Sequence, residues 1–220
     1  MRTVFVGLFV AGILSGCASM SREECVTADW RAIGYEDGAA GLPVSAVSGR
    51  RAICAKKAKV TVDMAAYMAG RDRGLDVYCE PGNGYAVGSR GGAYNGVCAG
   101  ALEDRFLAAY ETGRRLFDLQ AAVSSINGQI RQAHYDLRSV EHRMAETEVS
   151  IISPGFSAQE RITMLAELKQ LAEDKGAIEA SLDALNREHA LASQALDAFR
   201  DDLAFHGGWR GVAEPVDASF

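Results

Sequence analysis

The sequence predicts an all-α protein made of two helical parts that differ in composition. Residues 25–113 are rich in Gly, Ala and Tyr and hold four of the five cysteines of the chain. Residues 114–205 contain no cysteine, and their apolar residues recur at alternating spacings of three and four, which is the pattern of a coiled coil. We therefore expect a small disulfide-linked Gly/Tyr-rich helical domain followed by a long antiparallel coiled-coil hairpin.

The chain begins with the layout of a secretory signal peptide over residues 1–16. Arg2 precedes a short apolar run, and the segment ends at Leu14-Ser15-Gly16-Cys17. This ending resembles a bacterial lipobox, in which the cysteine receives acyl chains such as palmitate and becomes the first residue of the mature protein. The apolar run has about ten residues, whereas a membrane-spanning helix needs roughly 20. We therefore expect lipidation of Cys17, with a secretory signal cleaved at another site as the alternative.

Acyl chains on Cys17 would anchor the protein stably to a membrane, because each buried CH₂ contributes about 0.8 kcal/mol and two or more chains suffice. Ala18, not Asp, follows the cysteine. In Gram-negative lipoproteins an Asp at this position retains the protein in the inner membrane, so we expect attachment to the outer membrane, facing the periplasm. Residues 17–24 then form a lipidated linker, and its residues after Cys17 span at most about 25 Å when extended.

Charge excludes some classes of function. Removal of residues 1–16 takes away one charge, that of Arg2, so the formal charge changes from −6 to −7. Because acidic chains are unsuited to nucleic acids, we predict no nucleic-acid partner. The local exception is residues 50–59, in which five of the ten residues are cationic. This stretch is either a solvated helix face or a surface that contacts anionic lipid headgroups.

The remaining cysteines predict two disulfides. They are Cys25, Cys54, Cys79 and Cys98. An even number in an oxidising compartment indicates disulfides, whereas separations of 19 residues or more lack the close cysteine pairs of a zinc site. Three pairings are possible. We favour Cys25–Cys54 and Cys79–Cys98, because each closes a short local loop, for which the chain-entropy model gives roughly 3 kcal/mol.

Glycine and tyrosine recur in residues 25–113 at a fixed spacing. The pattern Tyr-x2-Gly starts at Tyr35, Tyr67, Tyr85 and Tyr110. Glycine pairs four residues apart accompany it, namely Gly34/Gly38, Gly70/Gly74 and Gly88/Gly92. Residues three and four apart share one face of a helix, and glycine on that face lets another backbone approach closely. We therefore expect short helices packed through glycine faces, at intervals too uneven for a solenoid.

Three motifs in this part resemble a known family. They are Cys25-x4-Trp30-x3-Gly34-x2-Asp37-Gly38, then Ala66-Tyr67-x2-Gly70-x3-Gly74-Leu75-x2-Tyr78-Cys79, and, after Gly84-x3-Gly88, Tyr94-x2-Val97-Cys98. Their spacing is similar to that of a family of proteobacterial envelope lipoproteins known only as a domain of unknown function. The resemblance covers about residues 17–118. It implies an envelope lipoprotein and carries over no activity.

The apolar seam of residues 114–205 falls into two segments. The first runs through Leu116, Leu119, Val123, Ile126, Ile130, Ala133, Leu137, Val140, Met144, Thr147 and Ile151, and the second through Met164, Leu168, Leu171, Lys175, Ile178, Leu182, Leu185, His189, Ala192, Leu196, Phe199 and Leu203. Between them, residues 153–157 contain Pro and Gly and cannot continue a helix. Ser157 followed by Glu160 is the signature of a capping box that starts a new helix.

The polar residues Lys175 and His189 lie on this seam, where such residues usually fix the register or the oligomeric state. An isolated two-helix hairpin gains from a further partner, so a homodimer that forms a four-helix bundle is an option. Helices of about 38 residues would make a rod of roughly 55 Å. The tail, residues 206–220, has no periodicity and is expected to be flexible.

No motif indicates an enzyme, a cofactor or a metal. The carboxylates nearest the aromatic motif are Asp29, Glu36, Asp37 and Asp63. Paired carboxylates beside aromatic residues are used in glycan hydrolysis, but carboxylates equally cap helices and form salt bridges. We predict a non-enzymatic outer-membrane lipoprotein that acts as an envelope structural or protein-interaction factor. Residues 114–205 would bind an envelope protein whose identity the sequence does not give.

The alternative function is a binding module for peptidoglycan or another envelope glycan. Aromatic and acidic side chains in one place bind sugars by stacking and hydrogen bonding. The residues that would line such a site are Trp30, Tyr35, Asp37, Tyr67 and Tyr85.

Overall fold

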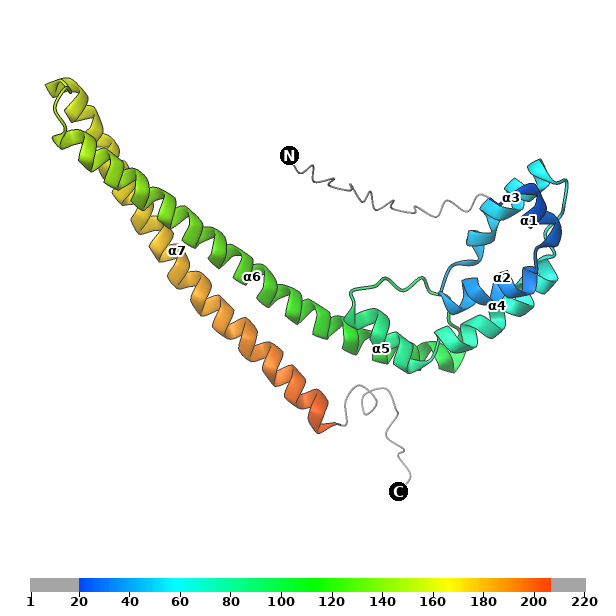
Figure 1. The fold of residues 1–220 in the computed structure, drawn as a ribbon. Helices are drawn as coiled ribbons and strands as arrows, with labels where there is room; N and C mark the ends of the chain where they lie inside the picture. The colour runs from blue at the N-terminus through cyan, green and yellow to red at the C-terminus, as the bar shows by residue number, and fades with distance from the viewer. Residues whose placement is uncertain (1–19, 207–220) are drawn as a thin grey trace, which may run out of the picture. The chain divides into compact units, whose positions relative to one another are not determined.

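The structure is a computed structural model, and it describes residues 20–206 of the chain. Within these residues there are seven α-helices, one 3₁₀ helix and no strand, which confirms the all-α fold (Figure 1). The predicted signal peptide, Cys17 and nearly all of the predicted flexible tail lie outside the described residues.

The chain divides into two compact units. Unit 1 comprises the described residues of Met1–Cys79 together with Tyr94–Ala99, and unit 2 comprises those of Glu80–Ala93 and Gly100–Phe220. This division differs from the boundary after residue 113 that the sequence suggested. Residue 113 lies inside one continuous helix, α6 (Gly100–Ile152), because the first turns of this helix pack against another helix before the hairpin begins.

Unit 1 contains α1 (Arg22–Thr27), α2 (Trp30–Ala39), η1 (Val44–Ala46), α3 (Val47–Lys57) and α4 (Met64–Tyr78). Side chains close the N-termini of three of these helices. Ser21 and Glu24 form a capping box at α1. Asp29 Oδ1 accepts hydrogen bonds from two backbone N–H groups of α2, and Asp63 Oδ1 accepts one from α4. Two of the candidate catalytic carboxylates are therefore helix caps.

Both favoured disulfides are present, and both lie within unit 1. Cys25 is bonded to Cys54, which joins α1 to α3, with a Cα–Cα distance of 5.3 Å. Cys79 at the end of α4 is bonded to Cys98, with a Cα–Cα distance of 5.7 Å. The first disulfide belongs to the core of the unit, where it packs with Trp30, Val47, Val62 and Tyr67.

Helices α2 and α4 pack through glycine, as the spacing predicted. A Cβ added at Gly34 or Gly38 would lie less than 3.0 Å from a backbone carbonyl oxygen of α4. A Cβ at Gly70 or Gly74 would meet the backbone of α2 in the same way. The two backbones are thus in direct contact, and no side chain larger than hydrogen fits between them.

Unit 2 contains α5 (Pro81–Ser89), the long helix α6 and α7 (Ala158–Phe205). Its helices α5 and α6 use the same glycine packing, through Gly84, Gly88 and Gly113. The pair expected from the sequence, Gly88 and Gly92, is not on one helix. Because α5 ends at Ser89, Gly92 follows the helix, and Gly84 is the partner of Gly88 on the packing face.

The α2–α4 pair and the α5–α6 pair are internal repeats. Gly34, Gly38 and Gly41 correspond to Gly84, Gly88 and Gly91, and each of the three lies 50 residues before its counterpart. Gly41 and Gly91 both have positive φ, of 65° and 74°, and both lie against an aromatic ring of the second helix, that of Tyr78 or that of Phe117. The second helices correspond with a different offset, since Gly74 matches Gly113, which is 39 residues later.

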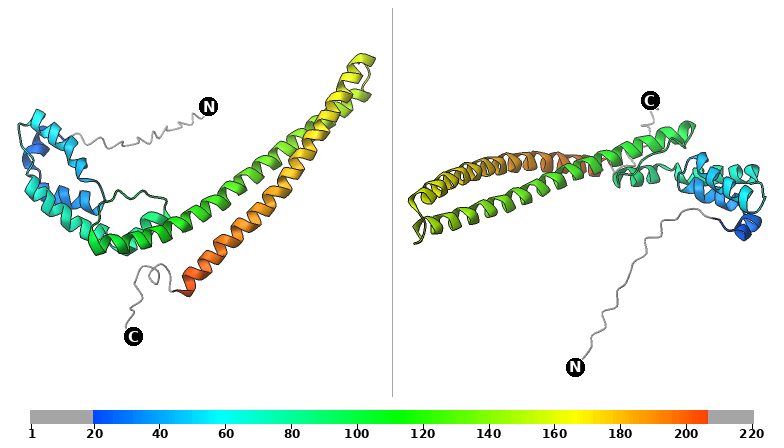
Figure 2. Two further views of the ribbon diagram at one scale, coloured as in Figure 1. Left: turned by 180° about the vertical axis from the view of Figure 1, so that it is seen from behind. Right: turned by 90° about the horizontal axis from the view of Figure 1, so that it is seen from above.

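Helices α6 and α7 form the antiparallel hairpin that the heptads predicted (Figures 1 and 2). Every residue of both predicted seams is buried or half-buried, and most of the intervening residues are exposed. Helix α6 ends before the predicted turn, and Ser157 and Glu160 form the predicted capping box of α7. Lys175 Nζ lies 2.8 Å from Glu141 Oε1 on the opposite helix. This ion pair joins the two helices at a seam position and raises the pKa of Lys175.

Candidate functional site

A buried polar cluster in unit 1 contains two of the residues that the sequence selected for ligand binding. Asp37 is 3% exposed, and its carboxylate accepts two hydrogen bonds from Arg50, at 2.6 and 3.1 Å. The hydroxyl of Tyr67, a fully buried residue, donates to Asp37 Oδ2 over 2.9 Å. Both carboxylate oxygens are therefore engaged inside the protein, by side chains from α3 and α4.

The position of Tyr67 changes its acidity. Burial, and secondly the hydrogen bond to the Asp37 carboxylate, raises the pKa of Tyr67 to about 12. Both effects disfavour a second negative charge at this place. The phenol thus remains a hydrogen-bond donor throughout the physiological range of pH.

Arg71 of α4 lies near this cluster and lacks a hydrogen-bond partner for one of its nitrogens. The residue is 5% exposed, and Nη1 makes no hydrogen bond to protein within residues 20–206. The Asp37 carboxylate accepts its hydrogen bonds from Arg50 and Tyr67, so Asp37 does not satisfy this nitrogen. An unpaired buried nitrogen on a cation has a free-energy cost, and water that reaches Nη1 would reduce this cost.

The five proposed ligand-binding residues do not line one surface. Trp30 is in the core of unit 1, and Tyr67 and Asp37 are buried and paired with each other. Tyr35 is exposed on α2, and Tyr85 belongs to α5 in unit 2. The packing face of α2 explains the difference, because Asp37 lies next to Gly38 on the side that meets α4.

A shallow cavity of about 340 Å³ borders the polar cluster. Arg50 reaches its wall together with Met20, Glu24, Thr27, Ala28, Ile33 and Glu36. The Arg50 guanidinium is already paired with Asp37, so Glu24 and Glu36 supply the other charges of the wall. A cavity with one paired cation and two carboxylates on its wall has no strong preference for a small anion.

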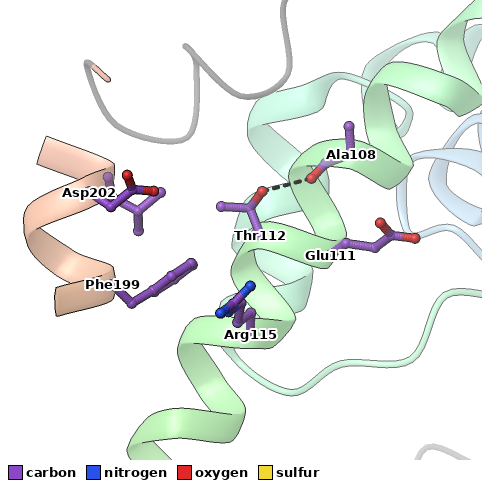
Figure 3. Close-up of a pocket in the computed structure, with 7 residues that line it drawn as sticks. Ala108, Glu111, Thr112, Arg115, Phe199 and Asp202 are labelled. Atoms are coloured by element: carbon purple, nitrogen blue, oxygen red, sulfur yellow. Dashed lines mark hydrogen bonds between the residues drawn. The ribbon is translucent and has the colours of Figure 1, made fainter. Parts of the chain in front are cut away.

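A second cavity, of about 360 Å³, lies between α6 and α7 within unit 2 (Figure 3). Phe199 projects from α7 towards Arg115 on α6, and the guanidinium carbon lies 5.2 Å from the centre of the ring. The hydroxyl of Thr112 donates to the Ala108 carbonyl of its own helix over 2.8 Å. The contact of Arg115 with Phe199 joins the two helices, and the Thr112 hydroxyl has no proton left to donate to a ligand.

The turn of the hairpin carries exposed apolar side chains that the heptads did not predict. We call this set the end patch. It comprises Val149, Ile152, Phe156, Ile162 and Leu165. Ile152 is 81% exposed, whereas the seam residue Ile151 beside it is half-buried. The sequence contained a signal for this patch, because apolar residues near the turn also occupy positions outside the a/d seam.

No group of three or more His, Cys, Asp or Glu side chains within residues 20–206 could hold a metal ion. No helix in the same range is both long and apolar enough to cross a membrane.

Comparison with known proteins gives one match. No curated protein and no solved structure matches the chain. A family model matches residues 29–115, which include both glycine-packed helix pairs and end two residues after Gly113. The rest of the hairpin lies outside the match. Residues 29–115 are therefore similar to the family described as Protein of unknown function (DUF2799).

Proposed function

We propose that this protein is a lipid-anchored factor of the outer membrane whose hairpin binds another envelope protein. The end patch is the observation that supports this function most directly. Its residues are large, apolar, exposed and close to the turn in the sequence, and exposed apolar surface is typical of protein-interaction sites. Four of the five residues of the patch are more than half exposed.

The hairpin is suited to present such a patch. Its helix α7 has 48 residues, which at 1.5 Å each make it about 72 Å long. Cross-helix contacts near the turn hold its end, since Arg143 pairs with Glu167 over 3.0 Å and Arg161 Nη2 donates to the Ser153 carbonyl over 2.8 Å. A preformed surface loses little conformational entropy when it binds.

The anchor is the second part of the proposal. Ser21 caps the first helix only four residues after Cys17. Four residues span at most about 14 Å. A lipid on Cys17 would therefore hold α1 and the rest of unit 1 close to the membrane surface.

We assign no enzymatic activity to this protein. Three of the four candidate carboxylates have structural partners: Asp29 and Asp63 cap helices, and Asp37 is held by Arg50 and Tyr67. Binding of a glycan by the buried residues Trp30, Asp37 and Tyr67 would need unit 1 to open, so we do not propose it.

Site-specific photo-crosslinking in the native host tests the role of the end patch. A photoreactive residue is placed at Ile152 or Phe156 of the full chain, and at Ser139, an exposed polar position of α6 outside the end patch, as the control. We expect one adduct from both end-patch positions and none from Ser139. Its mass should exceed that of the chain by the mass of a different protein.

A pair of variants shows whether the apolar surface itself makes this contact. Ile152→Ser with Ile162→Ser should abolish the adduct formed from Phe156. Leu191→Ser is the matched control, because Leu191 is an apolar residue of α7 that is 68% exposed and lies outside the patch. An adduct of twice the chain mass would show a homodimer instead. Equal loss in both variants would contradict the proposal.

A further inference from the structure

A group of exposed cations in unit 1 suggests a second contact with the membrane. Four cationic side chains are exposed here, three in α3 and one directly after the residue that caps it. We call them the α3 cationic surface, and they are Arg51, Lys56, Lys57 and Lys59. Arg50, the fifth cation of this stretch, is paired with Asp37 and is not part of it.

No carboxylate among the described residues lies within ion-pair distance of these four cations, and Lys57 is partly engaged by the Met20 carbonyl. The neighbouring helix α1 brings Glu23 and Glu24, and Arg22 offsets one of these charges. Glu24 accepts hydrogen bonds from Ser21, which lower its pKa and keep it negative. The two helices together carry an excess of positive charge on a chain whose total charge is negative.

One hydrogen bond places this surface beside the lipidation site. Lys57 Nζ donates to the backbone carbonyl of Met20 over 2.9 Å. Met20 is three residues after Cys17, and three residues span at most about 11 Å. The sulfur that would carry the lipid is thus covalently restrained to the neighbourhood of the C-terminal end of α3.

We propose that the α3 cationic surface binds the anionic headgroups of the membrane leaflet that holds the lipid anchor. This inference rests on the proposed anchoring of Cys17. Lys and Arg near an anionic leaflet each strengthen binding about fivefold, and the attraction falls off within a Debye length of about 8 Å at physiological salt. The three residues from Met20 to Cys17 span at most about 11 Å, which is comparable to this length, and charges much farther from the leaflet are largely screened.

Binding of the mature chain without its lipid to vesicles tests this surface apart from the anchor. Residues 18–220 are mixed with vesicles of phosphatidylglycerol and phosphatidylethanolamine, or of phosphatidylcholine alone, and the bound fraction is measured by cosedimentation. We expect binding to the anionic vesicles only, weakened at least tenfold when salt is raised from about 50 to about 500 mM. Free inorganic phosphate at equal ionic strength should not compete. Effective competition would identify a phosphate site and not a membrane surface.

Two variants with the same change in net charge locate the contact. The first carries Arg51→Gln, Lys56→Gln, Lys57→Gln and Lys59→Gln. The control carries four substitutions of exposed hairpin cations, Arg138→Gln, Lys169→Gln, Arg187→Gln and Arg200→Gln. All eight side chains are exposed, so both variants should keep the circular dichroism spectrum of the parent.

We expect the first variant to bind anionic vesicles at least tenfold more weakly than the parent and the control to bind like the parent. Equal binding by the two variants would overturn the proposal. The assay uses neither the lipid nor the end patch, so its failure leaves the crosslinking result untouched. Mass spectrometry of Cys17 in the full chain tests the anchor separately.

Discussion

Asp37 and Tyr67 occupy the same places in α2 and α4 that Val87 and Phe106 occupy in α5 and α6. The glycine contacts of the two helix pairs match, but Val87 and Phe106 are apolar where Asp37 and Tyr67 form a buried polar pair. Glycine packing therefore does not require the polar residues. The polar residues have another role, because the ion pair between Asp37 and Arg50 attaches α3 to the first helix pair. Arg50 has no counterpart in unit 2.

The raised pKa of Tyr67 predicts a dependence of stability on pH. Below pH 10 the phenol is protonated in the folded and the unfolded chain, so its hydrogen bond contributes fully. Between pH 10 and about 12 only the unfolded phenol ionises, and the free energy of unfolding should fall by about 3 kcal/mol as pH rises. Urea unfolding at about pH 9 and about pH 11 should show about half of this loss, about 1.4 kcal/mol, because pH 11 is only one unit above the unfolded pKa.

Tyr67→Phe is the control for this experiment, because other tyrosines and the lysines also titrate in that range. The variant should be less stable near neutral pH by about 2 kcal/mol, since it lacks a hydrogen bond to a charged group. Its loss of stability between the two alkaline pH values should be smaller than that of the parent. The same loss in both proteins would show that the folded phenol does not have a raised pKa.

The residue scale also explains why the five proposed ligand-binding residues do not line one surface. The sequence brought together the right kinds of residue, aromatic and acidic, but it does not state which way they face. The signal was present in α2, because Asp37 lies three residues after Gly34 and beside Gly38. Those glycines were already expected to pack, so Asp37 belonged on the buried side of the helix.

Among the elements, the hairpin was the easiest to predict and the repeat the hardest. Heptads, turn and capping box are local signals, and all three were correct. The repeat of two helix pairs was hidden because the segments between the helices differ in length: η1 and α3 lie between α2 and α4 only. Ala109 also stands in α6 where α4 has Gly70, so the spacing of glycine is not the same in the two copies.

Glycine packing gives a prediction with an internal control in each unit. Gly34→Ala and Gly88→Ala should each lower the free energy of unfolding by about 3 kcal/mol, because the new methyl group would overlap a backbone carbonyl. Gly49→Ala and Gly176→Ala should raise it by about 0.5 to 1 kcal/mol, since a Cβ at either place meets nothing within 4 Å. Chemical denaturation of the four variants measures these changes. Similar effects at all four positions would contradict direct contact between the helix backbones.

For the molecule as a whole, the disulfides are distributed unequally. Both stabilise unit 1, whereas the described residues of unit 2 contain no cysteine. Reduction should therefore lower the unfolding temperature of unit 1 and leave that of unit 2 nearly unchanged. The chain-entropy model gives roughly 3 kcal/mol for each disulfide.

Two spectroscopic signals can follow the units separately. Trp30 is in the core of unit 1, so its fluorescence in a Trp209→Phe background reports that unit. Circular dichroism reports chiefly the long helices of unit 2. The fluorescence transition should move to lower temperature with reductant while the dichroism transition stays. The variant Cys25→Ala with Cys54→Ala should reproduce part of this shift without reductant, and a single common transition would contradict independent units.

The glycine faces determine how the paired helices attract each other. Where a Cβ would overlap a carbonyl oxygen, a glycine has a hydrogen on Cα that points at this oxygen. At Gly34, Gly38, Gly84 and Gly88 this oxygen belongs to the facing helix. The contacts are weak carbon-donor hydrogen bonds, each worth about 0.5 to 1 kcal/mol. The attraction is directional and comes from the main chain. The same interface geometry therefore occurs beside polar residues in the α2–α4 pair and beside apolar residues in the α5–α6 pair.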